Sequence, residues 1–240
     1  MKRPHTPAAP EPGDLDLTVA LQLLRQAGHA DALQDAVHPN LQKIIDGLCE
    51  LSLRDTLTGL ANTRHFLAAL EQEVDRVSRS GEIALLLLLD VDRFKSINDS
   101  CGHLAGDQAL RAVADVLAKN VRPMDTAARY GGDEFAVILP NCRPAAGRAI
   151  AERICEQVAQ TPLLRADGSK LRLTVSIGGA HISPWRKAST KELLGKADQE
   201  LYRAKAQGRN QVAMDTAVAL PVSSEEKLQL LNHLERDADE

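Results

Sequence analysis

Apolar residues recur every three to four positions in four stretches of the chain, which is the spacing of a helix with one buried face. The first stretch follows Asn62 and ends near Val77, and Thr58 or Asn62 is its expected cap. The others cover 108–121, 143–160 and 190–207. The expected buried residues of the first and last are Phe66, Leu70, Val74, Val77, Leu194, Ala197, Leu201 and Ala204.

Shorter apolar stretches predict strands. Ile83–Leu89 is apolar on both faces, which is typical of a central strand covered by helices. Leu171–Ile177 alternates, and we expect Gly178-Gly179 to end it. Thr126–Tyr130 and Phe135–Leu139 flank Gly131-Gly132, which predicts a β-hairpin because glycine adopts positive φ without steric cost.

The pattern divides the chain into four segments. Residues 1–13 are proline-rich and are expected to be disordered, 14–53 form an N-terminal helical segment, 54–215 form one domain, and 216–240 are a tail with a short helix. Leu41, Ile44, Leu48 and Leu51 have coiled-coil spacing. Two readings of that helix remain open: a parallel dimeric stalk, and a helix packed on its own domain.

Composition narrows the function classes. The chain has 240 residues, 44% of them hydrophobic, and a formal net charge of −4, which argues against a nucleic-acid binder. No apolar run is long enough to span a bilayer and the N-terminus has no signal-peptide pattern, so we expect a cytoplasmic protein. The four cysteines are scattered without metal-ligand pairing, which favours reduced thiols.

The candidate chemistry lies in acids at strand ends. Asp90 and Asp92 follow the central strand at a period of two, and Asp133 and Glu134 follow the two glycines of the hairpin. Carboxylates beside a bare backbone indicate a metal-bound phosphate, whereas the plain alternative is a solvated turn. No Walker loop or G-x-G-x-x-G motif follows a strand, which argues against a kinase-like phosphate site.

Several motifs, taken in order, resemble those of the GGDEF family, the diguanylate cyclases that condense two GTP into cyclic di-GMP. They read LTGLAN at 57–62, DVDRFKSIND at 90–99, RYGGDEF at 129–135 and ADQELYRAKAQGRN at 197–210. The resemblance extends from Asp55 to about Met214, and Thr63 departs from it where the family usually has arginine. It implies an α+β domain close to the ferredoxin-like palm, with a mostly antiparallel sheet flanked by helices.

The resemblance also implies site residues. Asp133 and Glu134 are the expected catalytic acids, and the metal, Mg²⁺ with Mn²⁺ as the alternative, would be bound by Asp90, the backbone carbonyl of Val91, Asp133 and Glu134. Guanine offers both donors and acceptors, which an amide and a carboxylate satisfy together, as Asn98 and Asp107 would. The implied GTP-binding residues are Phe94, Lys95, Asn98, Asp107, Gly131, Gly132, Lys205 and Arg209.

A second implied site binds the product as an inhibitor. Arg122 and Asp125 stand before the hairpin in the family's register, and Arg153 matches a further arginine of that contact. The plain alternative is a helix-end arginine, Arg122, paired with Asp125.

The implied enzyme works as a homodimer, because each site holds half of the reaction. The alternative function is a catalytically silent domain that acts as a cyclic di-GMP or GTP receptor, but every matched acid is present. A phosphodiesterase is disfavoured because the chain lacks room for a second full domain. The N-terminal helices are the candidate contact for a regulatory protein, and the sequence does not identify the activating signal.

Overall fold

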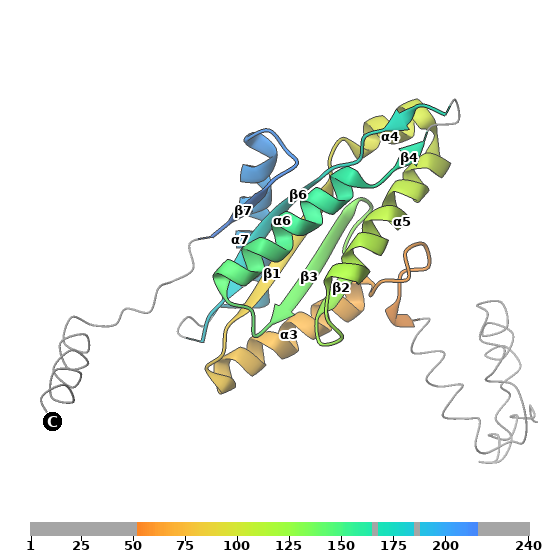
Figure 1. The fold of residues 1–240 in the computed structure, drawn as a ribbon. Coiled ribbons are helices and arrows are strands. Elements are labelled where there is room, and N and C mark those ends of the chain that lie inside the picture. The colour runs from red at the N-terminus through yellow and green to blue at the C-terminus, as the bar shows by residue number, and fades with distance from the viewer. Residues whose placement is uncertain (1–51, 165–167, 185–187, 216–240) are drawn as a thin grey trace, which may run out of the picture.

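The computed structural model describes residues 52–164, 168–184 and 188–215, and Figure 1 shows their arrangement. The expectations for the N-terminal segments and for the C-terminal tail lie outside these residues. None of the helices in the described ranges is long and apolar enough to cross a membrane.

A mixed sheet organises the domain. In the described residues it has five strands in the order β2-β3-β1-β6-β7, and every neighbouring pair is antiparallel except β6 and β7. A separate two-stranded sheet pairs β4 with β5. The bounds are β1 Ala84–Val91, β2 Thr126–Arg129, β3 Glu134–Pro140, β4 Leu163–Leu164, β5 Lys170–Leu171, β6 Val175–Ile182 and β7 Val212–Met214.

Helices cover both faces of the large sheet. Side chains of α5 and α6 pack against one face, and side chains of α3 and α7 pack against the other. The bounds are α3 Thr63–Ser80, α4 Phe94–Cys101, α5 His103–Asn120, α6 Pro144–Gln160 and α7 Thr190–Ala206. The predicted α+β class with a mostly antiparallel sheet is therefore confirmed.

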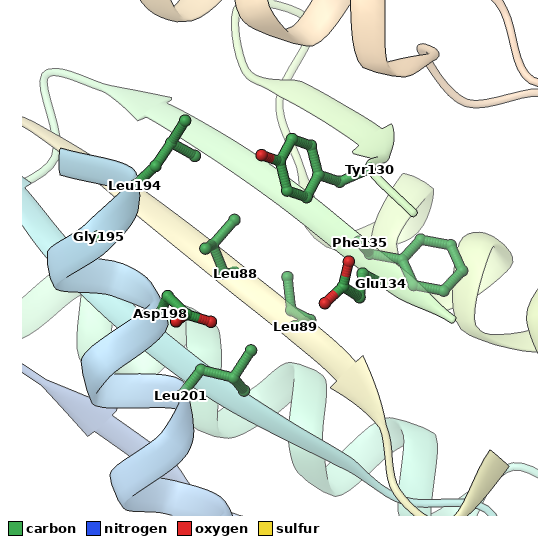
Figure 2. A pocket seen from close by; sticks show the side chains of 9 residues that line it. All are labelled: Leu88, Leu89, Tyr130, Glu134, Phe135, Leu194, Gly195, Asp198 and Leu201. Atoms are coloured by element: carbon green, nitrogen blue, oxygen red, sulfur yellow. The ribbon is translucent and has the colours of Figure 1, made fainter. Parts of the chain in front are cut away.

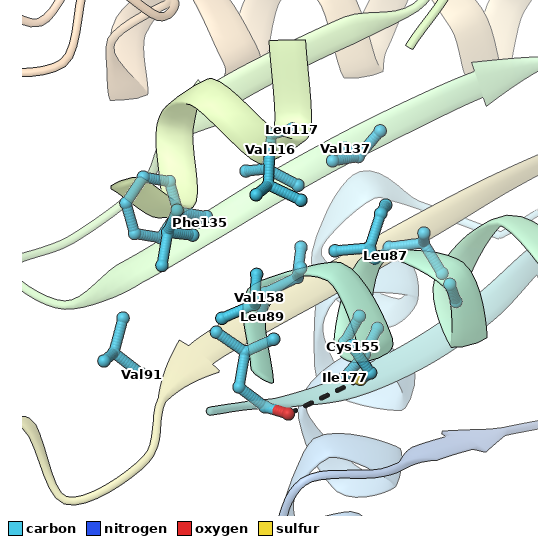
Figure 3. Close-up of a cluster of buried hydrophobic side chains, with 14 of the residues drawn as sticks. Leu87, Leu89, Val91, Val116, Leu117, Phe135, Val137, Cys155, Val158 and Ile177 are labelled. Carbon is cyan, nitrogen blue, oxygen red and sulfur yellow. Dashed lines mark hydrogen bonds between the residues drawn. The ribbon is translucent and has the colours of Figure 1, made fainter. Parts of the chain in front are cut away.

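Strand β1 lies in the middle and is buried on both sides, as its apolar composition predicts. Leu87 and Leu89 enter the core under α5 and α6, where they join Phe135, as Figure 3 shows. Leu86 and Leu88 enter the opposite core under α3 and α7. Burying one leucine side chain stabilises the folded state by about 1.5–3 kcal/mol, so the buried leucines of β1 contribute strongly to the stability of the sheet.

The expected strand over 171–177 is wrong in both its bounds. Strand β5 ends at Leu171, and β6 begins at Val175 and continues through Gly178 and Gly179 to Ile182. Gly178 is needed inside the strand because α7 lies directly against it, whereas a Cβ at Gly179 would lie 2.8 Å from Cγ of Met214. A Cβ at Gly178 would lie 2.2 Å from the carbonyl oxygen of Ala197 and 2.2 Å from the amide nitrogen of Leu201.

The helices follow the expected periods with shifted ends. Asn62 caps α3 by accepting from the His65 amide at 3.1 Å, and Ser189 caps α7 in a capping box with Glu192. The predicted helix over 108–121 begins five residues earlier, at His103, directly after Gly102. Val74 and Leu194 are only partly buried, and the neighbouring Glu73 and Leu193 take the buried positions.

Candidate active site

The hairpin turn at 130–133 is held by its own backbone and by Arg129. The amides of Tyr130 and Gly131 donate to the Glu134 carbonyl at 2.8 and 3.1 Å. The Arg129 guanidinium donates to the Gly132 carbonyl from Nη2 at 2.7 Å and from Nε at 3.2 Å. The turn is therefore fixed before any ligand binds.

The two glycines of this turn serve a different purpose from the predicted one. Neither Gly131 nor Gly132 has a positive φ, so the turn does not depend on glycine's conformational freedom. A Cβ at Gly131 would instead lie 2.5 Å from Oε2 of Glu134, whereas a Cβ at Gly132 would meet nothing within 4 Å. Gly131 leaves room for the Glu134 carboxylate, and Gly132 leaves the outer surface of the turn bare.

Arg129 also ties the turn to the segment that leads into α3. Its Nη1 lies 3.3 Å from both carboxylate oxygens of Asp55, and Asp55 accepts from the amide and the hydroxyl of Thr58 at 2.9 and 2.7 Å. Burial of Asp55 opposes ionisation, but Thr58 and Arg129 outweigh it and lower the pKa of this carboxyl. The sequence did not predict this link between the segment and the turn.

Pairing of β1 with β3 brings the acids together. Asp90 is the register partner of Glu134, and the Val91 amide donates to the Asp133 carbonyl at 3.1 Å. Lys205 reaches over from α7, and its Nζ lies 2.7 Å from Oδ2 of Asp90. Residues of three segments that are far apart in the sequence thus meet at one end of the sheet.

Burial, with a contribution from neighbouring charges, raises the pKa values of Asp90 and Glu134. Burial raises the pKa of Asp90, and the charges of Asp133 and Asp92 add to this rise while Lys205 opposes it. Burial likewise raises the pKa of Glu134, with further contributions from Asp90 and Asp133. The cluster therefore carries more negative charge than Lys205 offsets.

This donor set fits a hard divalent cation. Carboxylate oxygens are the ligands that Mg²⁺ and Mn²⁺ prefer, and an added cation would relieve the repulsion that raises the two pKa values. Among the described residues, no three His, Cys, Asp or Glu side chains lie close enough together to hold a metal ion as they stand. Asp90 is engaged by Lys205, so cation binding requires this ion pair to rearrange.

Glu134 also borders a pocket of about 230 Å³ between the sheet and α7. Figure 2 shows that Glu134 and Asp198 are its acidic side chains, among leucines of β1 and α7 and the ring of Tyr130. The charge of Asp198 contributes to the raised pKa of Glu134, after the larger effects of burial, Asp90 and Asp133. Asp198 stands in a motif that the sequence analysis quoted, but no role was predicted for it.

The two expected guanine ligands come from adjacent helices. Asn98 lies in α4 and Asp107 lies in α5. The side chains of α4 can pack closely on α5 because residue 106 is a glycine. A Cβ at Gly106 would lie 2.0 Å from Oδ1 of Asn98 and 3.2 Å from Cζ of Phe94. The amide of Asn98 therefore lies directly over the residue before Asp107.

The remaining expected GTP-binding cations are exposed. Lys95 lies in the first turn of α4, and Arg209 lies in the turn after α7 with a φ of 66°. Neither side chain makes a hydrogen bond or ion pair with another residue in the described part of the chain. Arg209 lines a pocket together with Asp92 and Arg93, and neither Asp90 nor Lys205 lines it.

The expected product site forms a closed turn after α5. The Arg122 amide donates to Oδ2 of Asp125 at 2.7 Å, and the Asp125 amide donates to the Arg122 carbonyl at 3.0 Å. Burial raises the pKa of Asp125, although its contact with Arg122 opposes this rise. The backbone of Arg122, and not its guanidinium, bonds Asp125, so the simple ion-pair alternative does not describe this geometry.

Arg153 lies beside the same turn. Its Nε donates to Oδ1 of Asn120 at 2.6 Å, at the end of α5. Arg122 and Asp125 line a surface pocket of about 660 Å³ together with Arg54 and His65.

The chain is similar to known proteins. The family model described as "Diguanylate cyclase, GGDEF domain" matches residues 52–211. Response regulator PleD of Caulobacter vibrioides is 42% identical over 72% of this chain and 38% of its own length. Diguanylate cyclase A of Treponema denticola is 38% identical over 70% of this chain and 45% of its own length. The chain thus spans less than half of these relatives.

A solved structure matches a larger share of the chain. The coiled coil and GGDEF domain of DgcB from Caulobacter crescentus, in complex with c-di-GMP, superposes with a TM-score of 0.70 at 30% identity. This match covers 82% of this chain and 100% of that one. With the family model matching well over half of the sequence, this chain belongs to the GGDEF family of diguanylate cyclase domains.

Proposed function

We propose that this protein is a diguanylate cyclase, which joins two GTP molecules into cyclic di-GMP and releases two pyrophosphates. The observation that carries the proposal is the meeting of Asp90, Asp133 and Glu134 beside Lys205 at the open turn of the hairpin. The activity named for the Treponema relative supports it. Every acid that the chemistry requires is present.

Each domain would bind one GTP. Asn98 and Asp107 present an amide and a carboxylate to the guanine edge, and the bare surface at Gly132 admits the phosphates close to the backbone. Lys205 and Arg209 offset the phosphate charge. The Asp90–Lys205 pair holds both partners in place until the nucleotide and its cation arrive.

The reaction would be an in-line displacement. The 3′-oxygen of one GTP forms a bond to the α-phosphorus of the other, and the bond from that phosphorus to the pyrophosphate breaks. Glu134 would take the hydroxyl proton, which is consistent with the raised pKa of this carboxyl. A divalent cation held by Asp90, the Val91 carbonyl, Asp133 and Glu134, Mg²⁺ or Mn²⁺, would lower the pKa of the hydroxyl and stabilise the leaving oxygen.

Two domains must face each other for this reaction, so we propose a homodimer. The DgcB structure comprises a coiled coil and a GGDEF domain and matches 82% of this chain, which supports a dimeric stalk in residues 14–53. The same structure contains c-di-GMP, which supports a product site at Arg122, Asp125 and Arg153. The free guanidinium of Arg122 is suited to a phosphate.

Asp90→Asn and Asp133→Asn test the proposal. Each removes one negative charge from the acid cluster with little change in volume, so we expect release of pyrophosphate from GTP to fall by at least about a hundredfold while the fold remains intact. The measurement is the initial rate with Mg²⁺ or Mn²⁺, together with a thermal melt of each variant. Near-parental rates in folded variants would contradict the assignment of the cation site.

A further inference from the structure

A basic pocket of about 310 Å³ is lined by Asp92, which follows Asp90 of the proposed cation site by two residues. Three loops meet there: the turn after β1, the connection between β5 and β6, and the turn after α7. They contribute the arginines Arg93, Arg172 and Arg209, and α4 adds the hydroxyls of Ser96 and Ser100. The family resemblance gives a role only to Arg209.

The three guanidiniums are available for an external anion. Within the part of the chain that the structure describes, none of them makes a hydrogen bond or ion pair, and all three residues are exposed. Asp92 is the acid that lines the pocket, but its carboxylate is already engaged. It accepts from the hydroxyls of Thr174 and Ser176 at 2.8 and 2.7 Å and from the Asn210 amide at 3.0 Å.

The backbone around the pocket is held in an unfavourable conformation. Of the four non-glycine residues with positive φ in the described ranges, three lie here: Arg93 at 56°, Arg209 at 66° and Asn210 at 48°. Such conformations cost free energy and persist where the surroundings enforce them, often at binding sites. Asp92 supplies that enforcement, because it links the turn after β1 to β6 and to Asn210.

The pocket shares Arg209 with the proposed phosphate site. Lys205 lies at Asp90, and Arg209 follows it by four residues at the point where α7 has ended. We propose that Arg93 and Arg172, together with Arg209, bind the β- and γ-phosphates of GTP and then retain the pyrophosphate after it leaves. This assignment rests on the proposed function and adds two binding residues to it.

Titration of the full chain with inorganic pyrophosphate tests the assignment without any turnover. Calorimetry in EDTA, without nucleotide, would compare the parent with Arg172→Gln and with Arg93→Asn, because asparagine tolerates the positive φ at position 93. We expect Kd to rise about tenfold in each variant, since each loses a charge-assisted contact. Arg148→Gln, an exposed arginine of α6 outside this pocket, should leave Kd unchanged.

The outcomes separate this inference from the proposed function. If pyrophosphate fails to bind the parent, or binds all the variants equally, the pocket assignment is overturned even where the chain synthesises cyclic di-GMP. If binding depends on Arg93 and Arg172 but GTP gives no cyclic product, the proposed function fails and the polyphosphate pocket stands. Equal melting temperatures of the parent and the variants exclude a folding defect as the cause of weaker binding.

Discussion

Glu134 is ionised at a free-energy cost in the cation-free protein. Its carboxylate lies over Gly131, is partly buried, and faces the charges of Asp90, Asp133 and Asp198. A carboxyl whose pKa is raised in the folded state binds its proton more tightly there than in the unfolded chain. Ionisation of Glu134 therefore lowers the stability of the folded protein as the pH rises from the ordinary pKa of a glutamate through the raised pKa.

Replacing Glu134 by Gln should remove this cost. In EDTA, we expect the variant to gain stability relative to the parent at pH 7 but to gain little at pH 4, where the parent carboxyl is protonated. Urea unfolding of both proteins at the two pH values measures the difference. Glu71→Gln, at an exposed position of α3, is the control. A gain that is equal at both pH values, or larger at pH 4, would show that charge repulsion is not the cause.

A substitution of Arg122 tests the proposed product site. Arg122→Ala removes a guanidinium that is able to bind phosphate bidentately, so the cyclic di-GMP concentration that halves the rate should rise at least about tenfold. The rate without added product should stay near that of the parent, because Arg122 lies in a turn apart from the acid cluster. Inhibition curves for the parent and the variant decide the question. Superimposable curves would leave Arg122 as a structural helix-end residue.

The sequence did not predict how closely α7 packs against β6. Gly178-Gly179 resembles a strand end, because glycine usually weakens strands. Only the folded chain shows that these glycines are needed for space, Gly178 against α7 and Gly179 against the side chain of Met214. The early start of α5 was missed for a related reason, since Gly102, with a φ of 81°, separates two helices without a loop.

Gly178→Ala should consequently destabilise the domain strongly. The new methyl group would meet backbone atoms of Ala197 and Leu201, which cannot move without shifting α7, and we expect a loss of at least about 3 kcal/mol. Gly195→Ala in α7 is the matched control, because a Cβ there meets nothing within 4 Å. Alanine should stabilise that helix by up to about 1 kcal/mol. Chemical denaturation of both variants compares them, and similar effects would contradict the packing argument.

For the whole molecule, the order of motifs predicted the fold class and the identity of the acids, because each motif is local in sequence. It did not predict how the site is held together. The register of Asp90 with Glu134, the Arg129–Asp55 contact and the bonds of Asp92 all join distant segments. Periodicity carries no information about such pairs, so their roles became visible only in the folded chain.

The proposed stalk would hold two whole domains together. Deleting residues 1–50 should leave GTP binding nearly unchanged but lower the specific activity at low protein concentration, with recovery as concentration rises. A stalk that pairs two domains raises their effective concentration to about the millimolar range. Specific activity measured against protein concentration, for the full chain and the deletion, tests this. Identical curves would support the alternative in which the helix packs on its own domain.

The chemical identity of the reaction product decides whether this protein is a diguanylate cyclase. The full chain would be incubated with GTP and Mg²⁺, and the products identified by mass spectrometry, with Asp133→Asn in parallel. We expect cyclic di-GMP together with two pyrophosphates per cyclic product, and neither from the variant. Binding of GTP or cyclic di-GMP without any dinucleotide product would contradict the account and would indicate a receptor that retains the family's fold.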